Sequence, residues 1–421
     1  IGPERKHRKT GAYNTEEHRR AVLDVARESM ILLKNEDQVL PLQAESGCKV
    51  AVIGANAAAI HSNGGGSAEI KALYEISPLM GIKKLLGGNV KVSYAPGYVI
   101  PDKKETSEIN WQAASTETAE NTEKESTVSG RALDEKQQEA LAEAVALAKA
   151  SDIVIFVGGL NHDFDVEGLD RVNMKLPYGQ DEVIDALLKA VPDTVVCMYA
   201  GAPVEMPWAE KAKAILWSYY AGMEGGTALA EILSGKVNPS GKLAETFIRD
   251  TSQCPAHTIG TFGKKDRVEY REGVMVGYRY YDTKKTDVLF PFGHGLSYTA
   301  FTYNDLEIIR QQENGRQTVK VSCSVTNTGE HAGKETVQIY VAPEQKKDRP
   351  VHELKAFEKV GLDAGETKRI CVILEERDFS HYDTDKKMPV PVNGTYEIQV
   401  GASSTDICLC GKIDLFLQKV K

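Results

Sequence analysis

The stretch DIVIFV at residues 152–157 is a strongly apolar run, and it ends directly at Gly158 and Gly159. Similar short apolar runs recur along the first half of the chain, at 49–54, 90–94, 194–200 and 214–219. Segments with helix signals lie between them, at 77–87, 134–150, 180–190 and 225–234. Short apolar strands that alternate with helices predict an α/β fold with a mostly parallel sheet covered by helices on both faces.

The segment 14–34 precedes these strands, and its pattern predicts a helix. Asn14 or Thr15 can cap its start, and apolar residues recur on one face at helical spacing. We expect the apolar run Met30–Leu33 to belong to the end of this helix.

The carboxyl ends of parallel strands form the edge at which such sheets bind ligands. The functional edge is therefore expected in four loops, those after Ile53, Val157, Ala200 and Tyr219. Each of these loops begins with or soon reaches a glycine.

The pattern changes in the second half of the chain. Residues 250–300 are rich in Gly, Tyr, Arg and Phe without a clear period, which is typical of an ordered connector. From about residue 301, polar and apolar residues alternate in several short runs separated by turns. This predicts an antiparallel β-sandwich, and since no Cys–Trp–Cys pattern is present, one of fibronectin type III-like form. We expect an α/β domain at 14–249, a connector at 250–300 and a sandwich at 301–421.

The composition of the chain limits the kinds of partner that it can be expected to bind. The 421 residues carry a formal net charge of -9 without a stripe of Lys and Arg, so nucleic acid is not an expected partner. No apolar stretch approaches the ~18 residues of a membrane span. The start at Ile1-Gly2-Pro3 is neither a signal peptide nor a natural initiation site, so we expect a piece of a longer protein. A homo-oligomer is possible.

Seven cysteines are present, and none forms a CxxC pair with zinc spacing. Cys197, Cys323 and Cys371 lie in apolar strand-like runs, whereas Cys408 and Cys410 would point the same way on one strand. Reduced thiols in the core are favoured over disulfides or a metal site.

The loop after 152–157 is the stretch richest in chemistry. Residues 162–171 hold four carboxylates, a histidine and an arginine, with glycines on either side. A carboxylate beside Phe164 and other acids can have a raised pKa, which suits a general acid. On spacing alone, a purely structural interpretation is favoured, in which Asp170 pairs with Arg171 and the other acids are solvated. A calcium site at Asp163, Asp165 and Glu167 is a weaker alternative, because the EF-hand frame is missing.

Several motifs occur together and in order. They are Glu167-Gly168-Leu169-Asp170-Arg171 followed by Leu176-Pro177 and Gln180, Leu32-Leu33-Lys34-Asn35, Asn238-Pro239-Ser240-Gly241-Lys242-Leu243 followed by Thr246-Phe247, and Phe290-Pro291-Phe292-Gly293-His294-Gly295. This series resembles glycoside hydrolase family 3, and the resemblance covers nearly the whole chain except the polar insertion at 103–131.

The resemblance implies a retaining β-glycosidase mechanism without metal or cofactor. In this family an Asp nucleophile lies on an N-terminal (β/α)8 barrel, and a Glu of the following α/β domain serves as acid/base. The matching position here is Glu167. No eightfold β/α repeat is present, so the nucleophile is expected on a missing barrel, and the chain alone is expected to be inactive.

Other residues carry weaker expectations. His162, Phe164, Asp165 and Arg171 are candidate substrate contacts. The segment Ser62–Ala68 lacks both phosphate-binding motifs, so it is expected either to line the pocket or to form a plain turn. Trp111 is expected to anchor local packing rather than to stack on a sugar. Trp208 and Trp217 are expected in the core, and Tyr278, Arg279 and Tyr281 against a neighbouring domain.

The resemblance implies hydrolysis of terminal β-D-glucosides or related β-glycosides, with an oligosaccharide or β-glycoside substrate and the barrel as partner. Periplasmic or secreted localisation follows from the family alone. The rival hypothesis is a non-catalytic carbohydrate-binding or structural module. An apolar interface larger than a usual monomer patch would favour the first hypothesis.

Overall fold

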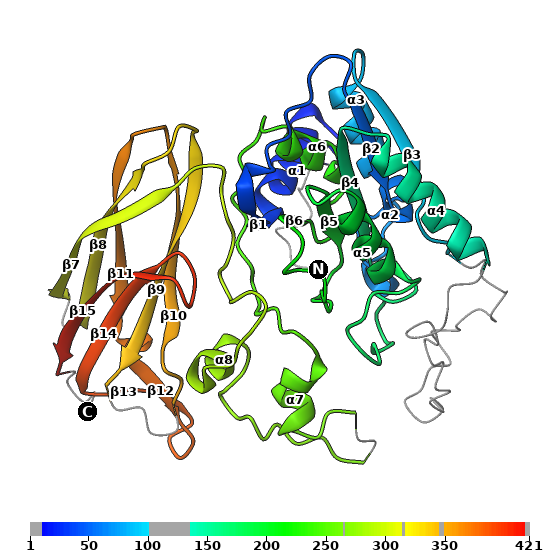
Figure 1. Cartoon of the computed structure of the whole chain (residues 1–421). Coiled ribbons are helices and arrows are strands. Elements are labelled where there is room, and N and C mark those ends of the chain that lie inside the picture. Colours follow the sequence, from blue (N-terminus) through cyan, green and yellow to red (C-terminus); the bar gives the residue numbers. More distant parts are fainter. Residues whose placement is uncertain (1–10, 101–134, 264–265, 314–315, 345–348, 417–421) are drawn as a thin grey trace.

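The computed structural model describes residues 11–100, 135–263, 266–313, 316–344 and 349–416. It comprises a helix-covered sheet and a β-sandwich, and a connector with two short helices lies between them (Figure 1). Trp111 and the insertion at 103–131 lie outside the described residues. Within those ranges, no helix has the length and apolar character that crossing a bilayer requires.

The described residues form a six-stranded sheet in the first half of the chain, in the order β1-β6-β5-β4-β2-β3. The strands are β1 (Ile31–Asn35), β2 (Lys49–Ile53), β3 (Lys91–Ala95), β4 (Ile153–Gly159), β5 (Val195–Tyr199) and β6 (Ala214–Trp217). All neighbouring pairs are parallel except β1 with β6, which is antiparallel. The predicted mostly parallel sheet is confirmed.

Strand β1 corrects the prediction of one helix over 14–34. Helix α1 (Glu16–Ser29) ends at Met30, and the next residues form the edge strand. Ile31 contributes to the core on one face of the sheet and Leu32 to the core on the other. Consecutive residues of this run are buried on both faces of the sheet, so the run shows no helical period. Over only four apolar residues, a strand cannot be distinguished from the end of a helix by sequence pattern.

Helices cover both faces of this sheet. Successive residues of β2 alternate between two cores, with Ala51 and Ile53 in one and Val50 and Val52 in the other. Residues of α4 (Glu135–Lys149) and α5 (Gln180–Ala190) pack into the first core. Residues of α1, α3 (Pro78–Leu86) and α6 (Gly225–Leu233) pack into the second.

Large aromatic residues support the first core. Trp208 and Trp217 are both buried, as predicted. Trp217 meets Phe247 edge to face, with ring centroids 4.7 Å apart.

The connector holds α7 (Pro255–Thr258) and α8 (Tyr278–Lys284). Tyr278 stacks on Phe292, and its hydroxyl accepts a hydrogen bond from the Leu354 amide at 2.7 Å. Arg279 pairs with Glu353 at 3.2 Å. Since Leu354 and Glu353 belong to the sandwich, these residues pack the connector against a neighbouring domain, as predicted.

The second half is an antiparallel sandwich, also as predicted. One sheet has the order β10-β9-β14-β15 and the facing sheet β11-β8-β7, with a small β12-β13 pair beside them. The strands are β7 (Phe301–Glu313), β8 (Arg316–Asn327), β9 (Gly333–Pro343), β10 (Glu353–Leu362), β11 (Thr367–Glu375), β12 (Ser380–Asp383), β13 (Met388–Pro391), β14 (Gly394–Gly401) and β15 (Ile407–Leu415). Alternate apolar residues of both sheets form one core, which includes Val321, Ile339 and Ile398.

The segment 238–242 contacts the sandwich through Asn238 and Lys242, while Ser240 bonds to α1 of the α/β half. Asn238 donates to the Ala332 carbonyl at 3.0 Å and accepts from the Tyr298 amide at 2.8 Å. Lys242 pairs with Glu335 at 3.0 Å, and both side chains are largely buried. Ser240 donates to Glu28 at 3.3 Å. Part of the recognised motif therefore serves to fix the sandwich on the α/β domain.

All seven cysteines lie among the described residues, and all are free thiols. Cys197 and Cys323 are buried, but Cys371, Cys408 and Cys410 are exposed. The expectation of core thiols is thus wrong for Cys371, Cys408 and Cys410, because these side chains lie on the solvent faces of β11 and β15.

Candidate active-site edge

Four loops converge at the carboxyl edge of the sheet. They follow β2, β4, β5 and β6, which are the four predicted from the sequence. Gly65, Asp165, Gly201 and Tyr220 come from these loops in turn and are joined by hydrogen bonds. Parallel strands bring residues that are 36 or more positions apart onto one edge in this way.

Asp165 is the centre of this meeting point. One of its carboxylate oxygens, Oδ2, accepts the Gly201 amide at 2.5 Å and the Tyr220 hydroxyl at 2.9 Å. Its carbonyl accepts the Gly65 amide at 2.9 Å. Burial, together with the charge and hydrogen bond of Asp165, raises the pKa of Tyr220, so the phenol stays a donor. Asp165 therefore anchors the loop after β4.

Glu167 lies two residues further on and is exposed. Its Oε2 accepts the Ser67 amide at 2.9 Å. Hydrogen bonds from the side chain and the amide of Ser67 lower the pKa of Glu167. The expectation of a raised pKa in this loop is wrong for Glu167, because its carboxylate meets a donor and solvent rather than Phe164 or a second acid.

Arg171 is half-buried and turned toward the protein. Its Nη2 donates to the Pro203 carbonyl at 2.9 Å. The structure gives no ion pair between Arg171 and Asp170, both of which lie in the described ranges, and Asp170 is exposed. The purely structural pairing inferred from spacing is therefore wrong. Burial lowers the pKa of the Arg171 guanidinium, and the nearby carboxylate of Asp165 opposes this.

A pocket of about 250 Å³ opens beside Arg171. Glu245, Thr246 and Tyr281 also line it. Nη1 of Arg171 and Oγ1 of Thr246 are buried there without a partner among the described residues. Burial raises the pKa of Glu245, with Arg171 acting against it. Two unpaired donors and a carboxylate are groups that can bind hydroxyls.

His162 and Phe164 differ in their surroundings. Nε2 of His162 lies 2.8 Å from the Asn63 carbonyl, so the ring contacts the glycine-rich segment. Phe164 packs edge to face on Tyr178, with centroids 5.6 Å apart, and joins the core of the α/β domain. The structure therefore places His162 near the surface that carries Glu167 and gives Phe164 a packing role.

Metal binding finds no support in this loop. Across the described ranges no cluster of His, Cys, Asp and Glu is arranged to hold an ion. The three acids of the calcium alternative have separate partners: Asp163 accepts from the Tyr178 hydroxyl, Asp165 from Gly201 and Glu167 from Ser67.

Three contacts of this edge were not anticipated, although Ser67 lies in the segment Ser62–Ala68 that was a candidate lining of the pocket. Ser67 holds Glu167, Tyr220 holds Asp165, and the half-buried His61 lies beside the rings of Tyr199 and Tyr220. Burial lowers the pKa of His61 to about 4, so it is neutral near pH 7. Sequence analysis could have found these residues from their position, because each lies in a loop that follows a strand of the parallel sheet.

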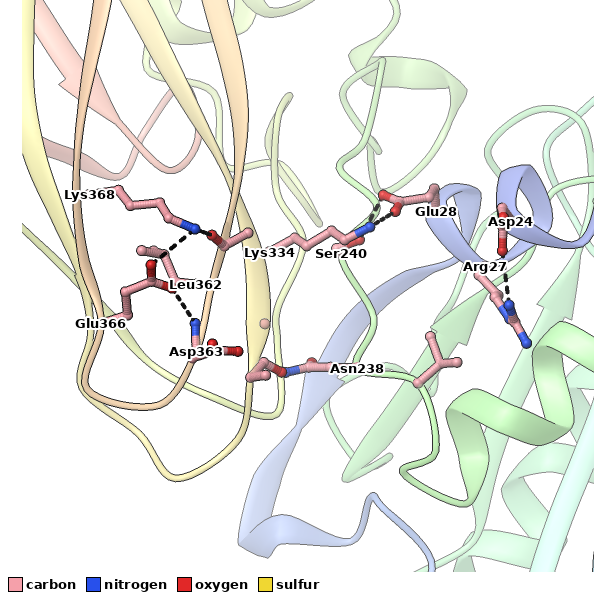
Figure 2. A pocket seen from close by; sticks show the side chains of 14 residues that line it. Asp24, Arg27, Glu28, Asn238, Ser240, Lys334, Leu362, Asp363, Glu366 and Lys368 are labelled. Atoms are coloured by element: carbon pink, nitrogen blue, oxygen red, sulfur yellow. Dashed lines mark hydrogen bonds and ion pairs between the residues drawn. The ribbon is translucent and has the colours of Figure 1, made fainter. Parts of the chain in front are cut away.

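A larger pocket, of about 630 Å³, lies elsewhere, between α1, the 237–240 segment and the sandwich (Figure 2). Six of the charged side chains that line it form ion pairs with one another: Glu28 with Lys334, Lys368 with Glu366, and Arg27 with Asp24. This pocket is a junction between domains and contains no residue of the four-loop edge.

Comparison with known proteins identifies the family of this chain. Residues 30–298 match the glycosyl hydrolase family 3 C-terminal domain, and residues 335–404 match a fibronectin type III-like domain. The chain belongs to glycoside hydrolase family 3. The resemblance inferred from the motifs is thereby confirmed, together with the two-part fold.

Relatives within family 3 are named as glycosidases. The thermostable beta-glucosidase B of Acetivibrio thermocellus is 40% identical over 398 residues, which cover 94% of this chain and 48% of the relative. An exo-alpha-(1->6)-L-arabinopyranosidase of Bifidobacterium breve is 35% identical, with 94% and 48% covered. The crystal structure of a family 3 beta-glucosidase from Bifidobacterium adolescentis superimposes with a TM-score of 0.82 at 34% identity, covering 99% of this chain and 57% of that one. The chain thus spans about half the length of these relatives.

Proposed function

We propose that this chain is the acid/base-bearing part of a retaining β-glycosidase that hydrolyses terminal β-D-glucosides. The observation that carries the proposal is Glu167: an exposed carboxylate at the carboxyl edge of the sheet, on a loop that Asp165 anchors. Its position in the family motif supports the same role. An Asp nucleophile would come from a barrel of the family 3 type, joined to or associated with this chain.

In the first step of double displacement, Glu167 gives a proton to the glycosidic oxygen while the nucleophile forms the glycosyl ester. In the second step, Glu167 takes a proton from the water that releases the sugar. The two carboxyl groups of a retaining enzyme lie about 5–5.5 Å apart, so the barrel must approach the exposed face of this loop.

The pKa of Glu167 fits a role that is completed by docking. In this chain the Ser67 hydrogen bonds lower the pKa and favour the ionised form. A second carboxylate and removal of water both raise the pKa of a carboxyl group. Docking of a barrel would supply both, and would bring Glu167 toward the protonated state that the first step requires.

Exposed apolar side chains support such a partner. Leu169 and Val172, on the loop of Glu167, are 54% and 79% exposed. The connector adds Phe262, Val268, Val274 and Tyr270, the last of which is 81% exposed. Contiguous patches of such side chains are typical of surfaces that a partner covers, and these residues are the candidates for one. They favour the enzyme half over a self-contained binding module.

Substrate contacts are proposed from the same edge. Arg171, with the unpaired Nη1 beside Glu245, is the strongest of the four candidates, and His162 is the next. Asp165 acts through the loop rather than on the sugar, and Phe164 through packing. Preference for glucosides follows the names of most relatives, whereas the arabinopyranosidase shows that the fold is compatible with another sugar. Localisation stays a prediction.

The test uses Glu167→Ala in the enzyme assembled with its barrel. An aryl β-glucoside with an activated leaving group should still form the glycosyl ester, but breakdown of the ester should slow by about 10²–10⁴-fold without the base. Azide, which needs no base, should restore turnover and yield the β-glycosyl azide. Unchanged turnover without azide would remove Glu167 from the acid/base role.

A further inference from the structure

We propose that the glycine-rich segment Gly64–Ser67 is a positioning element for Glu167, and that Gly66 is the position on which this depends. The proposal rests on the acid/base role proposed for Glu167. It gives a function to a segment that matches no phosphate-binding motif.

The segment runs alongside the loop of Glu167 and is bonded to it residue by residue. The Gly65 amide donates to the Asp165 carbonyl at 2.9 Å, and Gly65 forms a parallel bridge with Val166. The Ser67 amide then donates to Oε2 of Glu167 at 2.9 Å. The two segments therefore form a short two-stranded contact that ends at the carboxylate.

Gly66 lies at the closest point of this contact. A Cβ atom there would lie 2.6 Å from Cβ and 3.0 Å from the amide nitrogen of Glu167. The φ angle of Gly66 is +77°, a region that L-residues rarely adopt. Only glycine lets the Ser67 amide approach the carboxylate along this path.

The opposite side of the loop is held as well. Asp165 is fixed through Oδ2 by Gly201 and Tyr220, and a Cβ on Gly201 would lie 2.8 Å from that oxygen. The loop is thus held between the segment 64–67 on one side and the ends of β5 and β6 on the other. Neither side contributes a long, flexible side chain to Glu167 itself.

This arrangement fixes the carboxylate of Glu167 through one neighbouring residue. Oε2 of Glu167 accepts the Ser67 amide, and the Ser67 side chain also hydrogen-bonds the carboxylate. Displacement by about 1 Å can cost about 10²-fold in rate, so the contact with Gly66 matters for catalysis more than for stability.

The test compares Gly66→Ala with Gly88→Ala. Gly88 also has a positive φ, of +91°, but a Cβ there meets nothing within 4 Å. Both variants carry backbone strain, and only the first presses on Glu167. In the assembled enzyme, Gly66→Ala should lower kcat about 10–100-fold on glycosides with poor leaving groups, which need the acid. The loss should be several-fold smaller on activated aryl glycosides, and KM should change little.

A second readout uses this chain alone and needs no activity. Gly66→Ala should speed amide hydrogen exchange over residues 160–170, and Gly88→Ala should not.

If Gly66→Ala fails to fold, Ser67→Pro removes the amide donor without a Cβ at position 66 and should give the same dependence on leaving group. A foldable variant with full activity on poor leaving groups would overturn the positioning role. Failure of the Glu167→Ala test would instead overturn the proposed function, while the exchange result would still report on the contact.

Discussion

Two carboxylates of one loop have opposite surroundings, although only Val166 separates them. Asp165 is half-buried and accepts hydrogen bonds from Gly201 and Tyr220. Glu167 is exposed, and its carboxylate is hydrogen-bonded by Ser67. The first residue is therefore suited to hold the loop, and the second is free to meet a substrate. Spacing alone could not separate these roles, since both partners of Asp165 come from distant strands.

The buried carboxyl group of Asp181 should make the stability of the fold depend on pH. Burial raises its pKa to about 7, and the Trp208 indole, which donates to it at 2.9 Å, acts against this. Between its ordinary pKa of 3.8 and pH 7, the folded chain keeps a proton that the unfolded chain has lost. The free energy of unfolding therefore falls as the pH rises through this window.

Asp181→Asn should remove this fall in the free energy of unfolding with pH, because the amide does not ionise. Its oxygen can still accept the hydrogen bond from the Trp208 indole. The variant should match the parent near pH 4 and be more stable at pH 8, by about 1 kcal/mol or more. Denaturant unfolding of both proteins at the two pH values measures this difference. A stability difference that is the same at pH 4 and pH 8 would contradict the buried-acid account.

Strands and helices of the first half were largely predictable, because apolar runs and capping residues are local signals. Ser77 caps α3 by accepting from the Met80 amide, with Pro78 at its first position, as expected. The exception was Ile31–Asn35, whose pairing with β6 depends on residues 179 to 186 positions away. Local pattern cannot report an edge strand that only a distant partner stabilises.

Helices α3 and α6 approach so closely that glycine is required at their contact. A Cβ on Gly81 would lie 1.9 Å from the carbonyl oxygen of Gly226, which is backbone and cannot rotate away. We expect Gly81→Ala to separate the helices and to lower the free energy of unfolding by about 1–3 kcal/mol.

Gly225→Ala is the matched control, since Gly225 also lies in a helix without a positive φ and a Cβ there comes no closer than 3.4 Å to a neighbour, the Cβ of Ala221. Thermal unfolding of both variants separates the steric effect from loss of glycine itself. Equal melting temperatures for the two variants would show that the helices can move apart freely.

At the scale of the whole molecule, Glu28 of α1 connects the α/β domain to the sandwich. It forms ion pairs with Lys334 and Lys359 (the pair with Lys334 is seen in Figure 2). Burial alone would raise its pKa, but the two lysines outweigh burial and lower it. A carboxylate with a lowered pKa stabilises the fold above its ordinary value of 4.5, and this contribution is lost as the pH falls through the lowered value.

Glu28→Gln should therefore destabilise the chain at pH 7 and have little effect near pH 3. Because Glu28 is about one-third exposed, the expected loss is only about 1 kcal/mol. Melting curves at the two pH values measure it, and a loss that persists unchanged at pH 3 would assign the effect to packing rather than charge.

The division into two parts could be predicted from the sequence, because the hydrophobic period changes near residue 301. The contacts at the junction between the two parts could not be predicted. Asn238, Lys242 and Glu335 are polar residues without a local signal, and their pairing appears only when the domains meet. The loops of the functional edge were predictable from strand order. The roles of Ser67 and Tyr220 as hydrogen-bond partners of Glu167 and Asp165 could not be predicted, because contacts between loops produce no periodic pattern in the sequence.

We propose that this chain carries the acid/base and depends on a barrel for the nucleophile. The most direct measurement is hydrolysis of an aryl β-glucoside by the chain alone, by a family 3 barrel from the same enzyme alone, and by the two together. The account predicts that each part is inactive and that the mixture is active. Hydrolysis by the chain alone would contradict it, since a carboxylate among residues 163–170 would then have to act as the nucleophile.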